Sequence, residues 1–205
     1  MTPDLLSNLP SRIHMILEEG AKEGASRIAF TDEDGAEWSY RRLIDTVADV
    51  AGKMAELGVR PGDRVMVVCE NSIAAIVLMY AASRLDAWSV MTSARLSSRE
   101  IDLIKEDSSP RCVFYTHTIS SEADAHARRH GATLEVFDEI GRVKVGSLDA
   151  GTMAESVESD PAKQVATLIY TTGTTGRPKG VMLSHRNLAF VACRGKLTKT
   201  ILADD

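Results

Sequence analysis

The chain has 205 residues, with 24 Lys and Arg against 29 Asp and Glu, so its formal net charge is −5. This length and an ordinary apolar content of 44% suit one large α/β domain, or one domain with a fragment of another. The negative charge argues against nucleic acid or an anionic membrane as a partner, so any anion site must come from local geometry.

The cysteines and the apolar runs bear on compartment and membrane insertion. Cys69, Cys112 and Cys193 lie far apart, in or beside apolar runs, which predicts buried reduced thiols and a cytoplasmic location. No basic leader followed by an apolar block is seen, so we expect no secretion signal. The most apolar run, residues 73–82, is too short for a membrane span and predicts a buried helix.

The first third of the chain alternates helical and strand patterns. Residues 11–22 carry apolar side chains on one helical face, and two short strands at 27–30 and 36–40 flank an acidic turn. Ser39 is expected to cap the next helix and Gly58 to end it. The core stripe of that helix consists of Leu43, Val47, Val50, Met54 and Leu57.

The middle of the chain has the pattern of a parallel sheet. Residues 65–69 are continuously apolar, as in a strand covered on both faces, and Asn71 or Ser72 is expected to cap a helix that ends at Arg84. Further expected elements are a strand at 88–91, a helix from the capping box of Ser97 and Glu100 to about Asp107, a strand at 111–115, a polar helix at 120–130 and a strand at 134–137. This alternation predicts an α/β fold with right-handed crossovers.

A change of composition suggests a second unit. Residues 138–163 are acidic and contain glycine, and we interpret them as a surface connection to a new structural unit. The chain is therefore divided into domains at 1–160 and 161–205. The second comprises a strand at 165–170, a loop, a strand at 180–183 and a helix at 187–199.

The loop at residues 170–180 reads YTTGTTGRPKG. Glycines permit close approach of the backbone, successive N–H groups around a concavity bind anions, and hydroxyl and ammonium groups add donors. A polyphosphate is the ligand that uses all of these features. The candidate phosphate-binding residues are Thr171, Thr172, Gly173, Thr174, Thr175, Gly176 and Lys179.

This loop differs from the Walker A loop, G-x-x-x-x-G-K-[ST]. Lys179 stands between Pro178 and Gly180, so no hydroxyl lies beside it to hold magnesium. Strand-like residues flank the loop on both sides, which predicts a strand–loop–strand element without a helix dipole. A glycine-rich hairpin with chance threonines is the structural alternative, and the recurrence of Gly, Thr and Lys together disfavours it.

Residues 168–188, LIYTTGTTGRPKGVMLSHRNL, resemble the phosphate-loop signature of the adenylate-forming ligases, the AMP-forming acyl- and aryl-CoA synthetases with firefly luciferase and peptide-synthetase adenylation domains. The segments WSYRRL, LGVRPGDRV, CENS and ARLSSREIDLIKEDSSPR resemble further landmarks of that family, so the likeness covers about residues 28–188. Two segments depart from it. The usual Lys-Ala-Gly-Ala reads RLDA at 84–87, and the usual Val-Pro-Leu-Asn reads VMTS at 90–93.

The resemblance implies a three-layer α/β/α N-terminal subdomain with a mainly parallel sheet, ending in the phosphate-loop unit. It also implies an acid–thiol ligase of acyl-CoA or fatty acid metabolism. A carboxylate attacks the α-phosphate of ATP, and a thiol, usually coenzyme A, then displaces AMP. Mg²⁺ and fixed donors would stabilise the leaving pyrophosphate, and the loop residues would hold the β- and γ-phosphates. No catalytic residue and no metal ligand is expected in this chain.

Members of the resembled family are much longer than this chain. Their acyl pocket, adenine motifs, acidic magnesium ligand, ribose-binding aspartate and C-terminal lysine domain are not found here. We therefore expect an N-terminal fragment that is inactive alone and that associates with itself through apolar surfaces left exposed. This expectation fails if the coding region stops naturally after Asp205 and the short chain alone makes acyl-adenylate.

Several other residues have side chains that could serve a function. His185 is better suited to order a helix start than to act as a base, and His126 and His130 have metal-ligand spacing but no third ligand nearby. Trp38 and Trp88 are expected to pack in the core. The alternative function is a non-catalytic nucleotide- or protein-binding module that kept the loop. A Walker-type NTP hydrolase is disfavoured by the missing Gly-Lys-[Ser/Thr].

Overall fold

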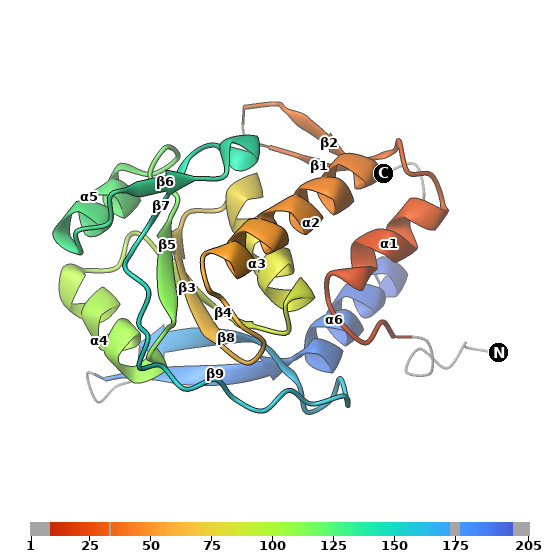
Figure 1. Cartoon of the computed structure of the whole chain (residues 1–205). Coiled ribbons are helices and arrows are strands. Elements are labelled where there is room, and N and C mark those ends of the chain that lie inside the picture. Colours follow the sequence, from red (N-terminus) through yellow and green to blue (C-terminus); the bar gives the residue numbers. More distant parts are fainter. Residues whose placement is uncertain (1–8, 33, 173–176, 199–205) are drawn as a thin grey trace.

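The computed structural model describes residues 9–32, 34–172 and 177–198 (Figure 1). The described part of the chain forms a two-stranded sheet and a seven-stranded sheet. In chain order the elements are α1 (Met15–Lys22), β1 (Ile28–Thr31), β2 (Glu37–Ser39), α2 (Tyr40–Glu56), β3 (Arg64–Cys69), α3 (Ile73–Arg84), β4 (Trp88–Ser93), α4 (Ser98–Ser108), β5 (Cys112–Tyr115), α5 (Ser121–Arg129), β6 (Leu134–Val136), the 3₁₀ helix η1 (Asp138–Ile140), β7 (Val143–Val145), β8 (Val165–Thr172), β9 (Pro178–Ser184) and α6 (His185–Thr198).

The larger sheet is parallel at its centre and antiparallel at both edges. Its strand order is β6-β7-β5-β3-β4-β8-β9, and β5, β3, β4 and β8 run parallel to one another. The predicted α/β fold with a mainly parallel sheet is confirmed. Strand β7 lies in the segment that the sequence pattern assigns to a surface connection, and that assignment is wrong for residues 143–145. Three residues are too few to show a strand period.

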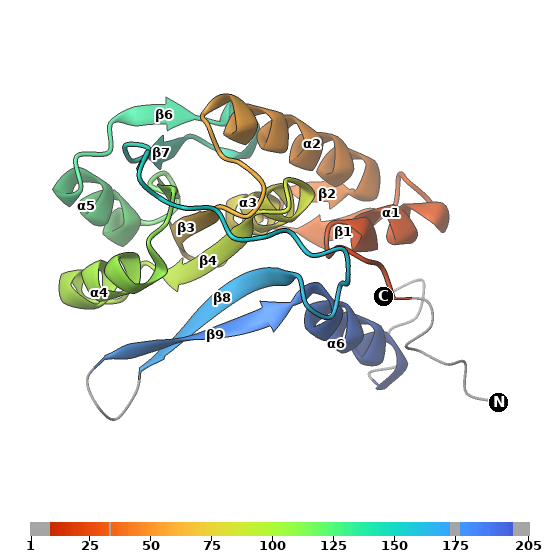
Figure 2. The same ribbon diagram turned by 60° about the horizontal axis from the view of Figure 1, so that its bottom comes forward.

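Helices cover both faces of the sheet and make three layers, as Figure 2 shows. Val65 and Val67 of β3 pack with α2 and α3, whereas Met66 and Val68 pack with α4 and α5. Alternate side chains of a strand point to opposite faces, so a strand buried on both sides needs the continuous apolar run that the sequence shows. In the described part of the chain, no helix has the length and apolarity needed to span a bilayer.

Serine hydroxyls begin the helices where the sequence predicts. Ser39, Ser72 and Ser97 each accept a hydrogen bond from the N–H three residues later, at 3.2, 3.3 and 3.3 Å. Ser97 and Glu100 form the full capping box. Gly58 follows the end of α2 with φ at +96°, a conformation that glycine adopts at low cost. Local sequence therefore sets these helix ends.

Residues 146–164, here called the strap, lead from β7 to β8. The predicted surface connection holds for most of this segment, since residues 147–151 and 153–160 are exposed. The expected new structural unit does not begin with a new sheet, because β8 pairs in parallel with β4 and continues the existing one. The division into domains at 1–160 and 161–205 stays a prediction.

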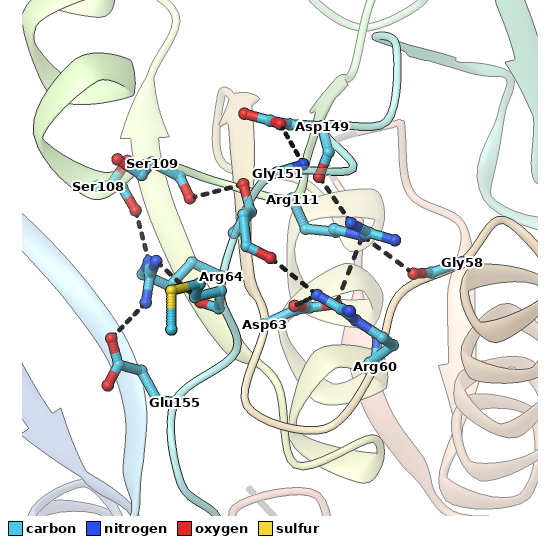
Figure 3. A network of polar contacts seen from close by, with 12 residues as sticks. Gly58, Arg60, Asp63, Arg64, Ser108, Ser109, Arg111, Asp149, Gly151 and Glu155 are labelled. Atoms are coloured by element: carbon cyan, nitrogen blue, oxygen red, sulfur yellow. Dashed lines mark hydrogen bonds and ion pairs between the residues drawn. The ribbon is translucent and has the colours of Figure 1, made fainter.

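Four arginines hold the strap by its backbone carbonyl oxygens. The donor and acceptor residues are Arg111 and Asp149 at 2.7 Å, Arg60 and Thr152 at 2.9 Å, Arg64 and Met153 at 3.4 Å, and Arg12 and Glu158 at 2.9 Å. Figure 3 shows Arg60 and Arg111 beside Asp63, and Arg64 between Ser108 of α4 and Glu155 of the strap. Guanidinium groups suit this role because one group offers several donors in a fixed plane.

Asp63 is the buried partner of two of these arginines, Arg60 and Arg111. Its carboxylate has no exposed surface, receives hydrogen bonds from Arg60 at 2.9 and 3.1 Å, and lies 3.8 Å from Arg111. A buried charge is stable only when it is paired and hydrogen-bonded. The turn between α2 and β3 therefore does more than reverse the chain, since Asp63 fixes two of the arginines that hold the strap, Arg60 and Arg111.

Candidate functional site

The candidate phosphate loop joins β8 and β9, which form an antiparallel hairpin (Figure 2). The predicted strand–loop–strand element is thereby confirmed. Next to the loop, Tyr170 pairs with Gly180, Thr171 with Lys179 and Thr172 with Pro178. Three of the candidate residues, Thr171, Thr172 and Lys179, thus lie in the strands. The other four, Gly173, Thr174, Thr175 and Gly176, lie outside the described residues.

Thr171 and Lys179 are brought onto one open face of the hairpin. They stand directly opposite each other, and both are exposed. Directly opposed residues of an antiparallel pair point to the same side, so the hydroxyl and the ammonium group face one region of solvent. Ile169 and Val181 form the next pair on this face and are 42% and 45% exposed. The strand ends therefore offer a donor pair for an oxyanion beside an apolar surface.

The far end of β9 is fixed by a cap and runs directly into α6. The Ser184 hydroxyl accepts from the N–H of Asn187 at 3.3 Å, and the Asn187 side chain accepts from the N–H of Ser184 at 3.0 Å. This reciprocal arrangement satisfies two backbone donors at the helix start. The helix begins two residues earlier than the sequence pattern predicts, and its N-terminus lies at the opposite end of β9 from Lys179.

His185 is the first residue of α6 and is completely buried. Its Nδ1 accepts a hydrogen bond from the N–H of Ile13 at 3.2 Å, and its own N–H donates to the carbonyl oxygen of Gln164 at 3.1 Å. Burial lowers the pKa of His185 to about 4, with a further contribution from Arg12. These contacts support the predicted ordering role and place the imidazole away from Thr171 and Lys179.

His126 and His130, which have metal-ligand spacing, instead make separate structural contacts. His126 is buried, with Nε2 at 3.1 Å from the carbonyl oxygen of Ala94. His130 bridges the Tyr115 hydroxyl at 2.6 Å and the Asp102 carboxylate at 2.9 Å. Among the described residues, no group of three or more His, Cys, Asp or Glu could hold a metal ion. Each imidazole therefore connects parts of the fold that are distant in sequence. The spacing of the two histidines alone could not reveal these contacts.

The three cysteines are free thiols. Cys69 and Cys112 are buried, as predicted, and burial raises their pKa to about 11 and about 12. Cys193 is only half-buried, so the prediction of a buried thiol is wrong there. Cys193 lies on α6. The polar and apolar residues of this helix follow no regular period, so the sequence does not show which face of it is buried.

The tryptophans pack against the core, as predicted. Trp38 is 3% exposed, and the guanidinium of Arg42 lies 3.6 Å from its ring centroid. Trp88 is half-buried and packs against the core cluster beneath α4 and α5. Neither residue belongs to the face that carries Thr171 and Lys179.

Tyr170 is a residue of the site that the sequence pattern did not single out. Its hydroxyl donates to the Asp107 carboxylate of α4 at 2.5 Å. Burial and this hydrogen bond raise the pKa of Tyr170. The alternation of side chains along β8 could have indicated that Tyr170 faces the core. Leu168 and Tyr170 both pack on the α4 side, while Ile169 and Thr171 point the other way.

Comparison with known proteins adds a family match. Residues 17–204 match the family described as AMP-binding enzyme. A feruloyl-CoA synthase from Amycolatopsis sp is 34% identical over 173 residues, which cover 83% of this chain and 33% of that enzyme. The long-chain-fatty-acid–CoA ligase FadD13 of Mycobacterium tuberculosis is 32% identical over 155 residues, which cover 71% of this chain and 29% of the ligase.

Solved structures show the same fold. MatB from Rhodopseudomonas palustris superimposes with a TM-score of 0.68 at 28% identity, covering 91% of this chain and 37% of that protein. VinN, solved with 3-methylaspartate, superimposes with a TM-score of 0.66 at 23% identity, covering 93% of this chain and 52% of VinN, and this likeness concerns the fold alone. The chain spans about a third of the length of the CoA ligases that it matches.

Proposed function

Because the chain belongs to the AMP-binding enzyme family of adenylate-forming ligases, we propose that it forms the part of such a ligase that holds the pyrophosphate end of ATP. The whole enzyme would activate a carboxylate as acyl-adenylate and transfer it to coenzyme A. The observation that carries the proposal is the pairing of Thr171 with Lys179 on the open face of the hairpin.

The proposed role of this face is to orient a leaving group. When a carboxylate attacks the α-phosphorus of ATP, negative charge develops on the departing pyrophosphate. Fixed donors stabilise that charge without having to reorganise during the reaction. We assign this role to Lys179, Thr171 and Thr172 in the strands, with Gly173, Thr174, Thr175 and Gly176 of the loop. The nucleophile in this scheme is the substrate carboxylate.

Magnesium and coenzyme A are proposed from family membership alone. The described residues contain no acidic cluster that could bind a metal ion, so we assign no metal ligand to this chain. When bound with ATP, Mg²⁺ would neutralise part of the negative charge of the leaving pyrophosphate. No residue is assigned to coenzyme A or to the acyl group. A cytoplasmic location is proposed on the basis of the free cysteines.

An exchange assay identifies the carboxylate substrate. The names of relatives point to both an aromatic acid and fatty acids, in a feruloyl-CoA synthase and a long-chain-fatty-acid–CoA ligase. The test is ATP–pyrophosphate exchange across a panel of aromatic, short-chain and long-chain carboxylates. Exchange is measured with the 205-residue chain and with the longest protein that its coding region specifies.

We expect the longer protein to exchange pyrophosphate with one class of acid. The 205-residue chain should bind ATP and pyrophosphate but complete no exchange. Absence of nucleotide binding by both proteins would reject the proposed function. Binding without exchange by the longer protein would favour a non-catalytic nucleotide-binding module.

A further inference from the structure

The part of the hairpin next to the loop extends beyond its parallel neighbour. Strand β8 pairs with β4 only from Thr167 to Ile169, so Tyr170 and the residues after it pair with β9 alone (Figure 2). A two-stranded ribbon is only marginally stable by itself and needs packing against another element. The position of Thr171 and Lys179 therefore depends on what supports this ribbon from the side.

Tyr170 supplies such a support. Its side chain packs on the α4 side of the hairpin, and its hydroxyl donates to Asp107 near the end of α4 at 2.5 Å. A hydrogen bond from a phenol to a carboxylate is short and strong because the acceptor is charged. The ring also lies across Gly180, where a Cβ atom would stand 3.0 Å from the ring carbon Cζ. Glycine at that position leaves room for the ring against β9.

The other end of this contact is itself held in place. Arg64, at the start of β3, donates from Nε to the carbonyl oxygen of Ser108 at 2.6 Å, one residue after Asp107. The same guanidinium pairs with the carboxylate of Glu155 in the strap at 2.6 Å (Figure 3). A cation at the C-terminal end of α4 is also favourable for the helix dipole. The end of α4 is thus fixed to both the sheet and the strap.

We propose that Tyr170 is a positioning residue for the strand ends that carry Thr171 and Lys179, which it holds beside α4 through Asp107. Its side chain lies on the face opposite Thr171 and Lys179, so it touches no phosphate itself. Its effect is to keep the two donors where the nucleotide meets them, and small displacements of positioned groups are costly in transfer reactions. This inference rests on the proposed function in one respect only, the identity of the ligand.

The test deletes each end of the contact in turn. Tyr170→Phe keeps the ring over Gly180 and deletes the hydroxyl, and Asp107→Ala deletes the carboxylate that accepts from it. Tyr80→Phe is the matched control, because Tyr80 is a partly buried tyrosine of α3 in the other core cluster. Amide hydrogen exchange at Thr171, Lys179 and Gly180 is measured by NMR without nucleotide.

We expect amide exchange at these positions to accelerate about tenfold in both variants and to stay unchanged in the control, with β3 and β4 protected as before. The double variant should match the single variants, since both delete one contact. For ATP and pyrophosphate, Kd should rise about tenfold, which corresponds to the loss of positioned donors. If Kd rises while the amides of β3 and β4 exchange as slowly as before, the substitution has displaced the donors without destabilising the whole fold.

Unchanged exchange in Tyr170→Phe and Asp107→Ala would overturn the inference, as would additive effects in the double variant. If the unaltered chain bound neither ATP nor pyrophosphate, the proposed function would fail, while the exchange data would still decide whether Tyr170 holds the hairpin.

Discussion

Ile13 and His185 are 172 positions apart in the sequence, and the N–H of Ile13 donates to Nδ1 of His185 at 3.2 Å. Since His185 follows β9 directly, this contact ties the segment before α1 to the base of the candidate phosphate-binding hairpin. Tyr170 supports the hairpin near the loop, and His185 supports it at the other end. Each support can be tested separately.

His185 makes stability depend on pH. Burial lowers its pKa to about 4 in the folded state, below the ordinary value of 6.5, so the folded state binds fewer protons than the unfolded state. Its contribution is complete above pH 6.5 and is lost as pH falls from 6.5 toward 4. His185→Gln should reduce the loss of unfolding free energy between pH 7 and pH 5 by about 1–2 kcal/mol.

Urea denaturation at both pH values gives the measurement, and staying above pH 5 avoids most carboxylate titration. Burial also lowers the pKa of His14 and His130, so part of the pH dependence should remain in the variant. Equal pH dependence in the variant and the unaltered chain would contradict this assignment.

Gly62 is expected to be intolerant of any side chain because the strap crosses it. A Cβ atom there would lie 1.9 Å from the carbonyl oxygen of Glu155, and φ is +79°. Gly35 has a similar φ of +83° and no described atom within 4 Å of its Cβ position. Gly62→Ala should therefore destabilise the chain by more than about 2 kcal/mol, whereas Gly35→Ala should cost about 1 kcal/mol of backbone strain.

Equilibrium unfolding in urea compares the two variants. Because the backbone strain is common to both, the difference between them isolates the clash with the strap. Equal losses would show that the strap moves away from Gly62 without cost.

Lys179 is expected to act on chemistry. In the longest protein that the coding region specifies, Lys179→Ala should slow ATP–pyrophosphate exchange more than about tenfold, because a charged contact to the leaving group is lost. Lys163→Ala removes the same charge from an exposed position on the strap and should leave the rate unchanged. Exchange at the normal rate in Lys179→Ala would remove this residue from the mechanism.

The open face of the hairpin is expected to promote self-association of the 205-residue chain. Strand β9 is an edge strand of the described sheet, and Ile169 and Val181 on this face are 42% and 45% exposed. Exposed apolar edges offer both backbone hydrogen bonds and apolar surface to a second chain. Sedimentation velocity should show association that rises with concentration and weakens in Val181→Thr.

Met153→Thr is the control for this experiment, because Met153 is 82% exposed but belongs to the strap. A monomer at every concentration, or equal effects of the two substitutions, would count against an interface on this face.

Asp86 is a departure from the resembled family that the sequence reveals but does not explain. Asp86 stands where that family usually has glycine, and it adopts φ of 55°. Aspartate tolerates this conformation better than most residues. Its carboxylate pairs with Arg12 at 2.5 Å, and Arg12 also holds the strap at Glu158. The substitution is visible in the sequence, but its ionic partner is not.

The sequence by itself determined the helix caps, the two-sided core strand, the α/β class and the strand–loop–strand element. These features depend on residues within a few positions of one another, where side-chain period and capping chemistry act directly. Only the tertiary structure decided that β8 continues the sheet beside β4, that arginines hold the strap, and that Tyr170 meets Asp107. Those contacts join segments far apart in the chain, and their geometry exists only after the layers have packed.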